Sequence, residues 1–210
     1  MVVKQLDLAT EAVHALAGVL SGAERERAGR LRAEHDRRRY IVARGRLREL
    51  LAQRLGTRPE SIDLVYGPRG KPALAGNGLH FNVSHSEDIA VYAFSRRGEI
   101  GVDVEAIRTL READDIASRT FSRRESEVYA ALEPRDRPLG FFNCWTRKEA
   151  VVKAVGHGLS MPLDDIEVTL APGEPAKLLR LGDMTGDRIG WRLRSFRPAP
   201  GFVAALATKN

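Results

Sequence analysis

The chain has 210 residues, of which 43% are hydrophobic and 30% charged, so it can bury a core and is neither a disordered nor a fibrous chain. No apolar run approaches the roughly 20 residues of a membrane-spanning helix, and the N-terminal residues lack the order of a signal peptide, which favours a cytoplasmic protein without a membrane partner. The single cysteine, Cys144, excludes an intramolecular disulfide and a cysteine-rich zinc site.

The net charge of +6 is unevenly distributed. Residues 24–58, called the basic segment below, hold 12 arginines and 5 acids, a net of +7, so the rest of the chain sums to −1. Arginine forms forked contacts with phosphate or carboxylate groups. The segment is therefore typical of a surface for an anionic partner, although a solvated helix rich in good helix formers would have the same composition.

The first half of the chain predicts helices followed by strands. Thr10 can cap a helix that runs to about Leu20, and Ser21 with Glu24 forms a capping box that opens a second helix. Apolar residues at three- and four-residue spacing make the basic segment an amphipathic helix that ends at Gly56. Strand-like runs follow at residues 62–66, 79–83 and 89–94.

The second half repeats this order after a strand at residues 100–105. A second capping box, formed by Ser122 and Glu125, opens a helix to about Leu132, and a longer helix covers about residues 139–155. Strand-like runs follow at residues 166–170, 177–181, 189–196 and 202–207.

Both halves thus predict an α+β architecture in which a helix packs on an antiparallel sheet. This pattern indicates two similar lobes, residues 1–98 and 99–210, with a seam near residues 97–101. No low-complexity linker separates them, so we expect the lobes to pack tightly.

Two acidic residues share one face of the strand at residues 100–105. Side chains alternate along a strand, which places Asp103 and Glu105 on the same side as Gly101, with their Cα atoms about 7 Å apart. Two carboxylates so placed can hold a hard cation such as Mg²⁺, with Gly101 leaving room beside them. The alternative is an ordinary polar face of a half-exposed strand.

Charged residues also interrupt the apolar face of the helix at residues 139–155. Lys148 and Glu149 fall inside the apolar arc, and Lys153 lies on its border one turn after Glu149. Buried charges are costly unless they are paired or bind a metal, so this pattern favours a functional site. The alternative is a surface pair of Glu149 and Lys153, with Lys148 extending to solvent.

Residues 82–86 combine polar side chains at the end of a strand. Ser84 and His85 are adjacent on extended chain and therefore point apart, which disfavours a nucleophile and base pair. A hydroxyl, an imidazole and free backbone N–H groups are suited to donating to phosphate oxygens.

Four motifs resemble, in order and spacing, those of the two-lobed 4′-phosphopantetheinyl transferases, the type that activates surfactin synthetase. They are Gly70-Lys71-Pro72, Phe81-Asn82-Val83-Ser84-His85-Ser86, Ile100-Gly101-Val102-Asp103-Val104-Glu105 and Trp145-Thr146-Arg147-Lys148-Glu149-Ala150-Val151-Val152-Lys153. The resemblance implies two lobes related by a pseudo-twofold axis, with a coenzyme A-binding N-terminal lobe, a metal-binding C-terminal lobe and the active site between them. The length resembles this class rather than the half-length holo-(acyl-carrier-protein) synthases, which trimerise, so we expect a monomer.

The activity implied is transfer of 4′-phosphopantetheine from coenzyme A to a serine of an acyl, peptidyl or aryl carrier protein, with release of adenosine 3′,5′-bisphosphate. By the same resemblance Asp103, Glu105 and Glu149 would bind Mg²⁺, and Glu149 and Lys153 would be catalytic, with Glu149 as metal ligand, general base or both. The residues expected to hold coenzyme A are Arg39, Arg44, Gly70, Lys71, Ser84, His85, Lys148 and Lys153. An acidic carrier protein would meet the outer face of the basic segment.

Two other functions compete with this interpretation. A nucleic-acid-binding protein would explain the basic segment, but not Lys148 and Glu149 inside an apolar arc, and only 6% of the residues are aromatic. A homologue that only binds coenzyme A or a carrier protein, without activity, is expected to lack one of the three acids, and all three are present.

Overall fold

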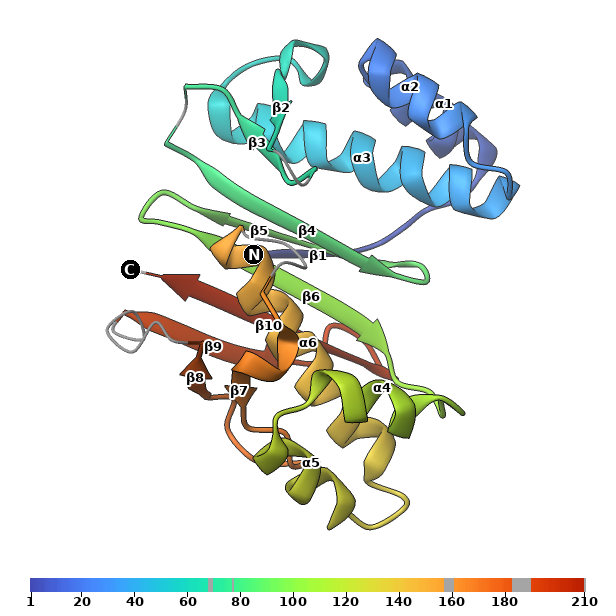
Figure 1. Ribbon diagram of the computed structural model, residues 1–210. Helices are drawn as coiled ribbons and strands as arrows, with labels where there is room; N and C mark the ends of the chain where they lie inside the picture. Colours follow the sequence, from blue (N-terminus) through green and yellow to red (C-terminus); the bar gives the residue numbers. More distant parts are fainter. Residues whose placement is uncertain (68–69, 77, 157–160, 183–189, 210) are drawn as a thin grey trace.

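A computed structural model describes residues 1–67, 70–76, 78–156, 161–182 and 190–209 (Figure 1). The helices are α1 (Thr10–Gly18), α2 (Gly22–Gly29), α3 (Glu34–Leu55), α4 (Ala113–Thr120), α5 (Arg123–Ala130) and α6 (Arg137–Val155), with short 3-10 turns at Pro59–Ser61 and Leu163–Asp165. The strands are β1 (Val2–Gln5), β2 (Leu64–Tyr66), β3 (Pro72–Leu74), β4 (His80–Ser86), β5 (Ile89–Ser95), β6 (Ile100–Ala106), β7 (Ile166–Val168), β8 (Leu178–Leu181), β9 (Trp191–Phe196) and β10 (Phe202–Lys209).

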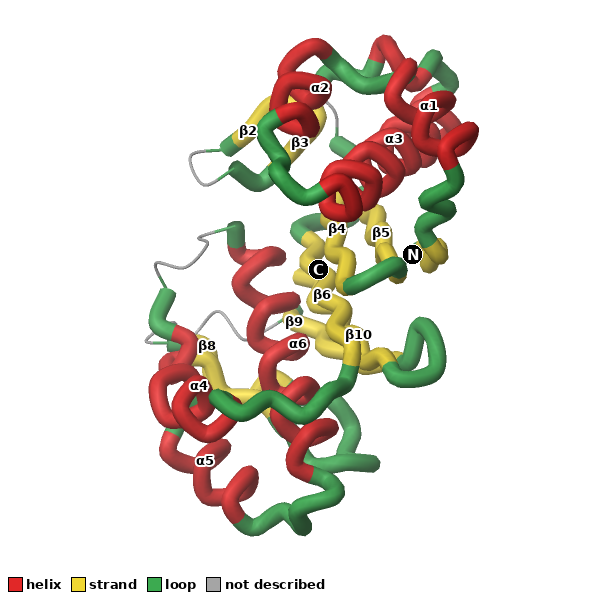
Figure 2. The backbone as a smooth tube through the Cα atoms, turned by 90° about the vertical axis from the view of Figure 1, so that its right-hand side faces the viewer, coloured by secondary structure: helices red, strands yellow, loops and turns green. Residues whose placement is uncertain are grey.

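Two antiparallel three-stranded sheets form the centre of the molecule. The first has the strand order β1-β5-β4 and the second the order β6-β10-β9, and β2 pairs with β3 and β7 with β8 in two small hairpin-like sheets. Long helices lie against the outer faces, α3 against the first sheet and α6 against the second (Figures 1 and 2). The α+β class predicted from the sequence is therefore confirmed.

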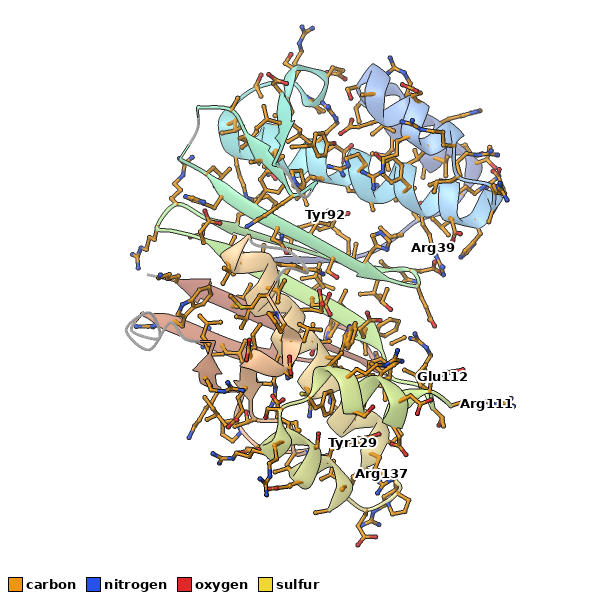
Figure 3. All side chains as sticks on the ribbon, viewed as in Figure 1. Arg39, Tyr92, Arg111, Glu112, Tyr129 and Arg137 are labelled. Carbon is orange, nitrogen blue, oxygen red and sulfur yellow. The ribbon has the colours of Figure 1, made fainter. Side chains whose placement is uncertain are left out.

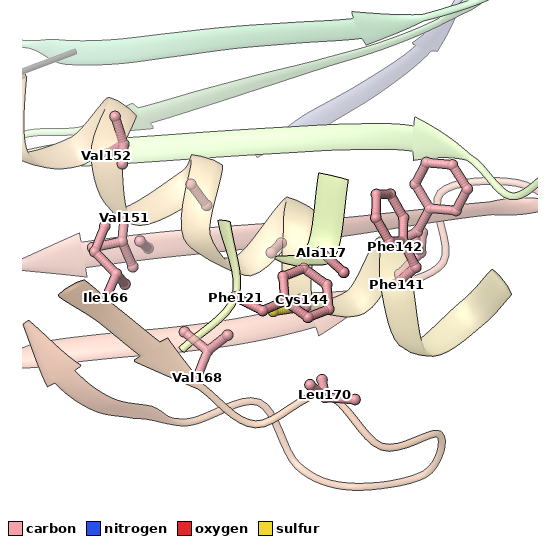
Figure 4. Close-up of a cluster of buried hydrophobic side chains, with 14 of the residues drawn as sticks. Ala117, Phe121, Phe141, Phe142, Cys144, Val151, Val152, Ile166, Val168 and Leu170 are labelled. Atoms are coloured by element: carbon pink, nitrogen blue, oxygen red, sulfur yellow. The ribbon is translucent and has the colours of Figure 1, made fainter. Parts of the chain in front are cut away.

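The hydrophobic core divides into three layers between these elements. One cluster joins α1 and α3 to the first sheet, and a second surrounds α6, where Phe121, Phe141 and Cys144 meet Ile166 and Leu170 (Figure 4). The third cluster lies between the two sheets and consists of Ile89, Val91, Ala93, Ile100, Val102, Val104 and Ala204. The alternation predicted along β6 is thus correct, since its apolar side chains face this middle layer.

Both capping boxes are formed as predicted. Ser21 Oγ accepts from Glu24 N at 3.3 Å while Glu24 Oε2 accepts from Ser21 N at 2.9 Å, and Ser122 and Glu125 repeat the arrangement at the start of α5. Gly56 ends α3 in the left-handed conformation with φ 66°. Local sequence signals therefore determine where these helices begin and end.

Gly101 has a different role from the one expected. A Cβ atom at this position would overlap Ala150 O and Ala154 N, both in the backbone of α6. The missing side chain makes room for the helix and leaves no space for a cation, which corrects the prediction. This close approach places the residues of α6 directly over β6.

Several elements were not predicted. The strands β1 and β3 are only four and three residues long and the helix α4 only eight, and β1 is an edge strand held by pairing with β5. The predicted strand at residues 189–196 begins outside the described residues and is seen as β9. No helix within the described ranges is both long and apolar enough to cross a membrane.

Candidate active site

Asp103 lies at the centre of the polar residues that the sequence singled out. Its side chain is only 3% exposed, between β4 and α6. Ser84 Oγ donates to Asp103 Oδ1 at 2.9 Å, and Lys153 Nζ lies 2.5 Å from the same oxygen and 3.3 Å from Ser84 Oγ. The second oxygen, Oδ2, is buried and has no hydrogen-bond partner among the described residues. A buried carboxylate oxygen without a donor is costly, and a bound cation would satisfy it.

Glu105 and Glu149 face the same region. Burial raises the pKa of both carboxyl groups, and the negative charge of Asp103 raises each pKa further, whereas Lys153 lowers it. Burial likewise raises the pKa of Asp103, against the opposing effect of Lys153. Burial raises the pKa of all three carboxyl groups, and Asp103 raises the pKa of the other two, so this environment favours a cation.

The carboxylates do not form a complete metal site by themselves. In the described part of the chain no three Asp, Glu, His or Cys side chains are close enough to hold a metal ion unaided. Mg²⁺ is usually held by one or two carboxylates and completed by water and the phosphates of a substrate. Asp103 Oδ2 with Glu105 or Glu149 fits that partial set of ligands.

A cationic cavity lies on the other side of β4. It has a volume of about 200 Å³, and its lining includes Arg27, Tyr40, Arg44, Asn82 and His85. Two of its polar atoms, Arg44 Nη1 and Tyr40 Oη, are buried without a hydrogen-bond partner in the described structure. Partial burial lowers the pKa of His85, and the charges of Lys153, Arg39 and Arg44 lower it further. The cavity is therefore suited to an anion such as a phosphate group.

The two arginines predicted for the phosphate are separated by the structure. Arg44 lines the cavity and lies over the rings of Tyr40 and Tyr66, with its guanidinium carbon 5.8 and 5.9 Å from the ring centres. Arg39 instead donates to Asp88 Oδ1 at 2.9 Å, beside the β4–β5 turn (Figure 3). The structure thus favours Arg44 over Arg39.

The group that holds Arg44 in place is an acid that was not predicted as part of the site. Glu24 is 3% exposed, and its Oε1 lies 3.7 Å from Arg44 Nε, while its Oε2 accepts from Arg48 Nε at 2.6 Å. Arg48 is buried and also donates to two backbone carbonyls, of Pro59 and Ile62. Arg44 and Arg48 of the basic segment are therefore both held by one buried acid. The capping box at Glu24 was visible in the sequence, but its contact with α3 was not.

Lys71 and Gly70 lie apart from the arginine cavity. Lys71 Nζ pairs with Glu99 Oε2 at 3.1 Å and lies 3.5 Å from Ala154 O, at a second cavity of about 330 Å³ between β3, β4 and the end of α6. Gly70 takes a positive φ of 77° in the turn between β2 and β3. Both cavities border Pro72, the first residue of β3.

Ser84 and His85 point apart, as predicted for adjacent residues on a strand. Ser84 faces Asp103, whereas His85 lines the arginine cavity. The strand β4 therefore separates a carboxylate region on one side from a cationic cavity on the other.

Lys148, which the sequence predicts to bind coenzyme A, is held inside the protein. Lys148 is 1% exposed and pairs with the buried Glu125 at 2.5 Å, and its Nζ also donates to the carbonyls of Thr120 and Leu163. These three contacts use all three donors of the ammonium group. The charge inside the apolar arc is thus paired with an acid at the start of α5, on the side away from Asp103.

Lys148→Met is expected to destabilise the protein by about 3–5 kcal/mol, because it leaves Glu125 buried and unpaired. Urea unfolding measures this loss, and adding Glu125→Gln should recover part of it because the unpaired charge is then removed. A variant of unchanged stability with weakened coenzyme A binding would contradict the structural role.

Comparisons with known proteins agree with the motifs. A family model described as the 4′-phosphopantetheinyl transferase superfamily matches residues 99–207, and a model of the N-terminal region of 4′-phosphopantetheinyl transferase matches residues 9–97. The 4′-phosphopantetheinyl transferase HetI of a Nostoc species is 37% identical over 206 residues, covering 96% of this chain and 84% of the relative. A 4′-phosphopantetheinyl transferase of Bacillus subtilis is 33% identical over 152 residues, which cover 72% of this chain and 66% of the Bacillus protein.

A solved structure is similar to half of the chain. The match to the holo-(acyl-carrier-protein) synthase of Thermotoga maritima covers 52% of this chain and 61% of the Thermotoga chain, with a TM-score of 0.40 and 21% identity. The assignment rests on the two family models and on the relatives that match along most of the sequence. The chain therefore belongs to the 4′-phosphopantetheinyl transferase superfamily.

Proposed function

We propose that this transferase moves 4′-phosphopantetheine from coenzyme A to a serine hydroxyl of an apo carrier protein, with Mg²⁺, at the seam between β4, β6 and α6. The observation that carries the proposal is the buried Asp103, whose Oδ2 has no partner within the described ranges while Lys153 of α6 contacts Oδ1. The anion cavity around Arg44 supports it, because coenzyme A carries a pyrophosphate and a 3′-phosphate.

Of the three acids predicted to bind Mg²⁺, Asp103 with Glu105 or Glu149 would hold the ion, and water and the phosphates of coenzyme A would complete its ligands. When bound, the ion would neutralise charge on the pyrophosphate as the phosphoryl group is transferred. Lys153 would supply a second positive charge to the same phosphates, because its ammonium group lies 2.5 Å from Asp103 Oδ1 and its side chain is 28% exposed.

The serine oxygen of the carrier attacks the phosphorus that bears pantetheine. A new bond forms between these atoms, and the bond from that phosphorus to the oxygen bridging it to the adenosine side breaks, so adenosine 3′,5′-bisphosphate leaves with that oxygen. The serine must lose its proton, and Glu149 is the candidate to accept it because burial raises the pKa of its carboxyl group and so makes it a stronger base.

The cationic cavity would bind the nucleotide end of coenzyme A. Arg44 is aimed into it by Glu24 and stacked on Tyr40, and Arg27 and His85 complete its polar lining. A preorganised arginine loses little entropy on binding a phosphate, which favours a tight and specific contact.

Arg44→Ala is expected to weaken coenzyme A binding about 10–100-fold, the loss of a charged hydrogen-bonded contact. Titration calorimetry with coenzyme A and with dephospho-coenzyme A, which lacks the 3′-phosphate, tests this assignment. If Arg44 meets the 3′-phosphate, the variant binds dephospho-coenzyme A as well as the wild type does.

Arg46→Ala is the matched control on the same helix, since Arg46 pairs with Glu49 at the surface and does not line the cavity. It should leave both affinities unchanged. Equal losses for the two ligands in Arg44→Ala would place Arg44 away from the 3′-phosphate.

Other properties stay predictions from the sequence. The division into lobes of residues 1–98 and 99–210 is supported by the two sheets, because each takes its strands from one side of that boundary. An acidic carrier as partner, a monomeric state and a cytoplasmic location are proposed on the sequence alone. Nucleic-acid binding is not proposed, because the acid Glu24 holds Arg44 and Arg48 of the basic segment and Arg39 pairs with Asp88.

A further inference from the structure

The edge of β6 that faces β4 is closed by side chains. Along a strand, successive N–H groups point to opposite edges, and β10 pairs with β6 along one of them. The N–H groups of Val102, Val104 and Ala106 are left for the other edge. They donate to Asn82 Oδ1 at 2.9 Å, Ser84 Oγ at 3.3 Å and Ser86 Oγ at 3.1 Å.

These contacts join the two sheets without a backbone ladder. Strands β4 and β6 lie side by side but belong to different sheets. Every second N–H group of β6 therefore donates to a side chain of β4, and not to a backbone carbonyl as it would within a sheet. The matching two-residue spacing fixes how far β4 is shifted along β6.

Two of the three side chains have a second task. Ser84 Oγ donates to Asp103 Oδ1 at 2.9 Å, and Ser86 Oγ donates to Glu105 Oε2 at 3.0 Å. A hydroxyl has one hydrogen, and the backbone N–H group occupies a lone pair of its oxygen. The hydroxyl hydrogen is therefore free to donate to the carboxylate. The N–H groups of β6 thus orient each serine, and each serine orients an acidic side chain of β6.

We infer that Ser86, a residue of β4, is a positioning residue for Glu105 and holds this carboxylate in the orientation needed for the divalent cation. The inference rests on the proposed function. Glu105 has no other hydrogen-bond donor among the described residues, and its nearest cation, Arg108, is 4.0 Å away and half exposed. Asp103, the acid that Ser84 contacts, is also contacted by Lys153. Ser86 is the hydrogen-bond donor given for Glu105 among the described residues.

Ser86→Thr and Ser86→Val form the matched pair, because they have the same shape and differ only in the hydroxyl group. Both residues suit a strand. Mn²⁺ replaces Mg²⁺ as the probe, and electron paramagnetic resonance measures free Mn²⁺ during titration of each full-length variant with coenzyme A present. We expect Ser86→Thr to bind Mn²⁺ like the wild type, and Ser86→Val to bind it about 10–100-fold more weakly, as for other partners of metal ligands.

Thermal unfolding of the metal-free variants shows whether they fold, and Ser86→Ala takes the place of Ser86→Val if the latter does not. Equal Mn²⁺ affinity of the wild type, Ser86→Thr and the variant without the hydroxyl would overturn the role of Ser86 and leave it as a contact between the sheets. Failure of the wild type to bind Mn²⁺ with coenzyme A present would contradict the metal-dependent function itself, and the inference with it.

Discussion

Asp103→Asn is expected to reduce transfer of phosphopantetheine by at least about a hundredfold, the size of effect found when one charge-stabilising group is lost from an active site. The amide keeps the shape of the side chain and can still accept from Ser84, but it removes the negative charge beside Lys153. The rate of carrier modification at saturating coenzyme A measures the loss.

Stability separates this effect from misfolding. Burial raises the pKa of Asp103 in the folded protein above its value in the unfolded chain. The free energy of unfolding therefore falls as the pH rises from the unfolded-state pKa to the folded-state pKa, because the unfolded chain loses its proton first. Asparagine carries no such cost, and the metal-free variant should therefore unfold at neutral pH no more readily than the wild type. A marked drop in melting temperature would assign Asp103 to the fold instead.

Gly101→Ala is expected to abolish most of the activity from a position that touches no substrate. The added methyl group would overlap Ala150 O and Ala154 N, so α6 has to move away from β6. Overpacking of this kind costs about 1–3 kcal/mol, and a shift of about 1 Å in the catalytic groups carried by α6 can cost about a hundredfold in rate. Unfolding and transfer assays on the same preparation measure both losses.

Gly18→Ala is the matched control, since a Cβ atom there would meet nothing within 4 Å. The control should keep full activity and equal or greater stability. Full activity in Gly101→Ala would show that the close packing of α6 on β6 is not needed to place Glu149 and Lys153.

Much of the scaffold could be predicted because its signals are local. The capping boxes at Ser21 and Ser122 and the left-handed glycine at position 56 involve neighbours in sequence, and strict alternation assigns the two faces of β6. The edge strand β1 could not be predicted, because four residues carry little pattern and the strand depends on its partner β5.

The candidate site was predicted in composition but not in arrangement. The apolar arc of α6 correctly indicates that Lys148 is buried, but its partner Glu125 lies 23 residues earlier on α5, and no spacing rule connects them. Ser86 is a similar case, since its role depends on how β4 and β6 meet. Contacts between distant segments decide whether a buried charge serves the fold or the reaction.

The central claim is tested most directly by the mass of an apo carrier protein after incubation with the purified enzyme, coenzyme A and Mg²⁺. A panel of acyl, peptidyl and aryl carriers covers the substrates considered. We predict that at least one carrier gains the mass of one phosphopantetheine group on its serine. The gain should form at least about a hundredfold more slowly with Asp103→Asn and should disappear when the divalent cation is chelated. Unmodified carriers throughout the panel, from a folded enzyme that binds coenzyme A, would contradict the account.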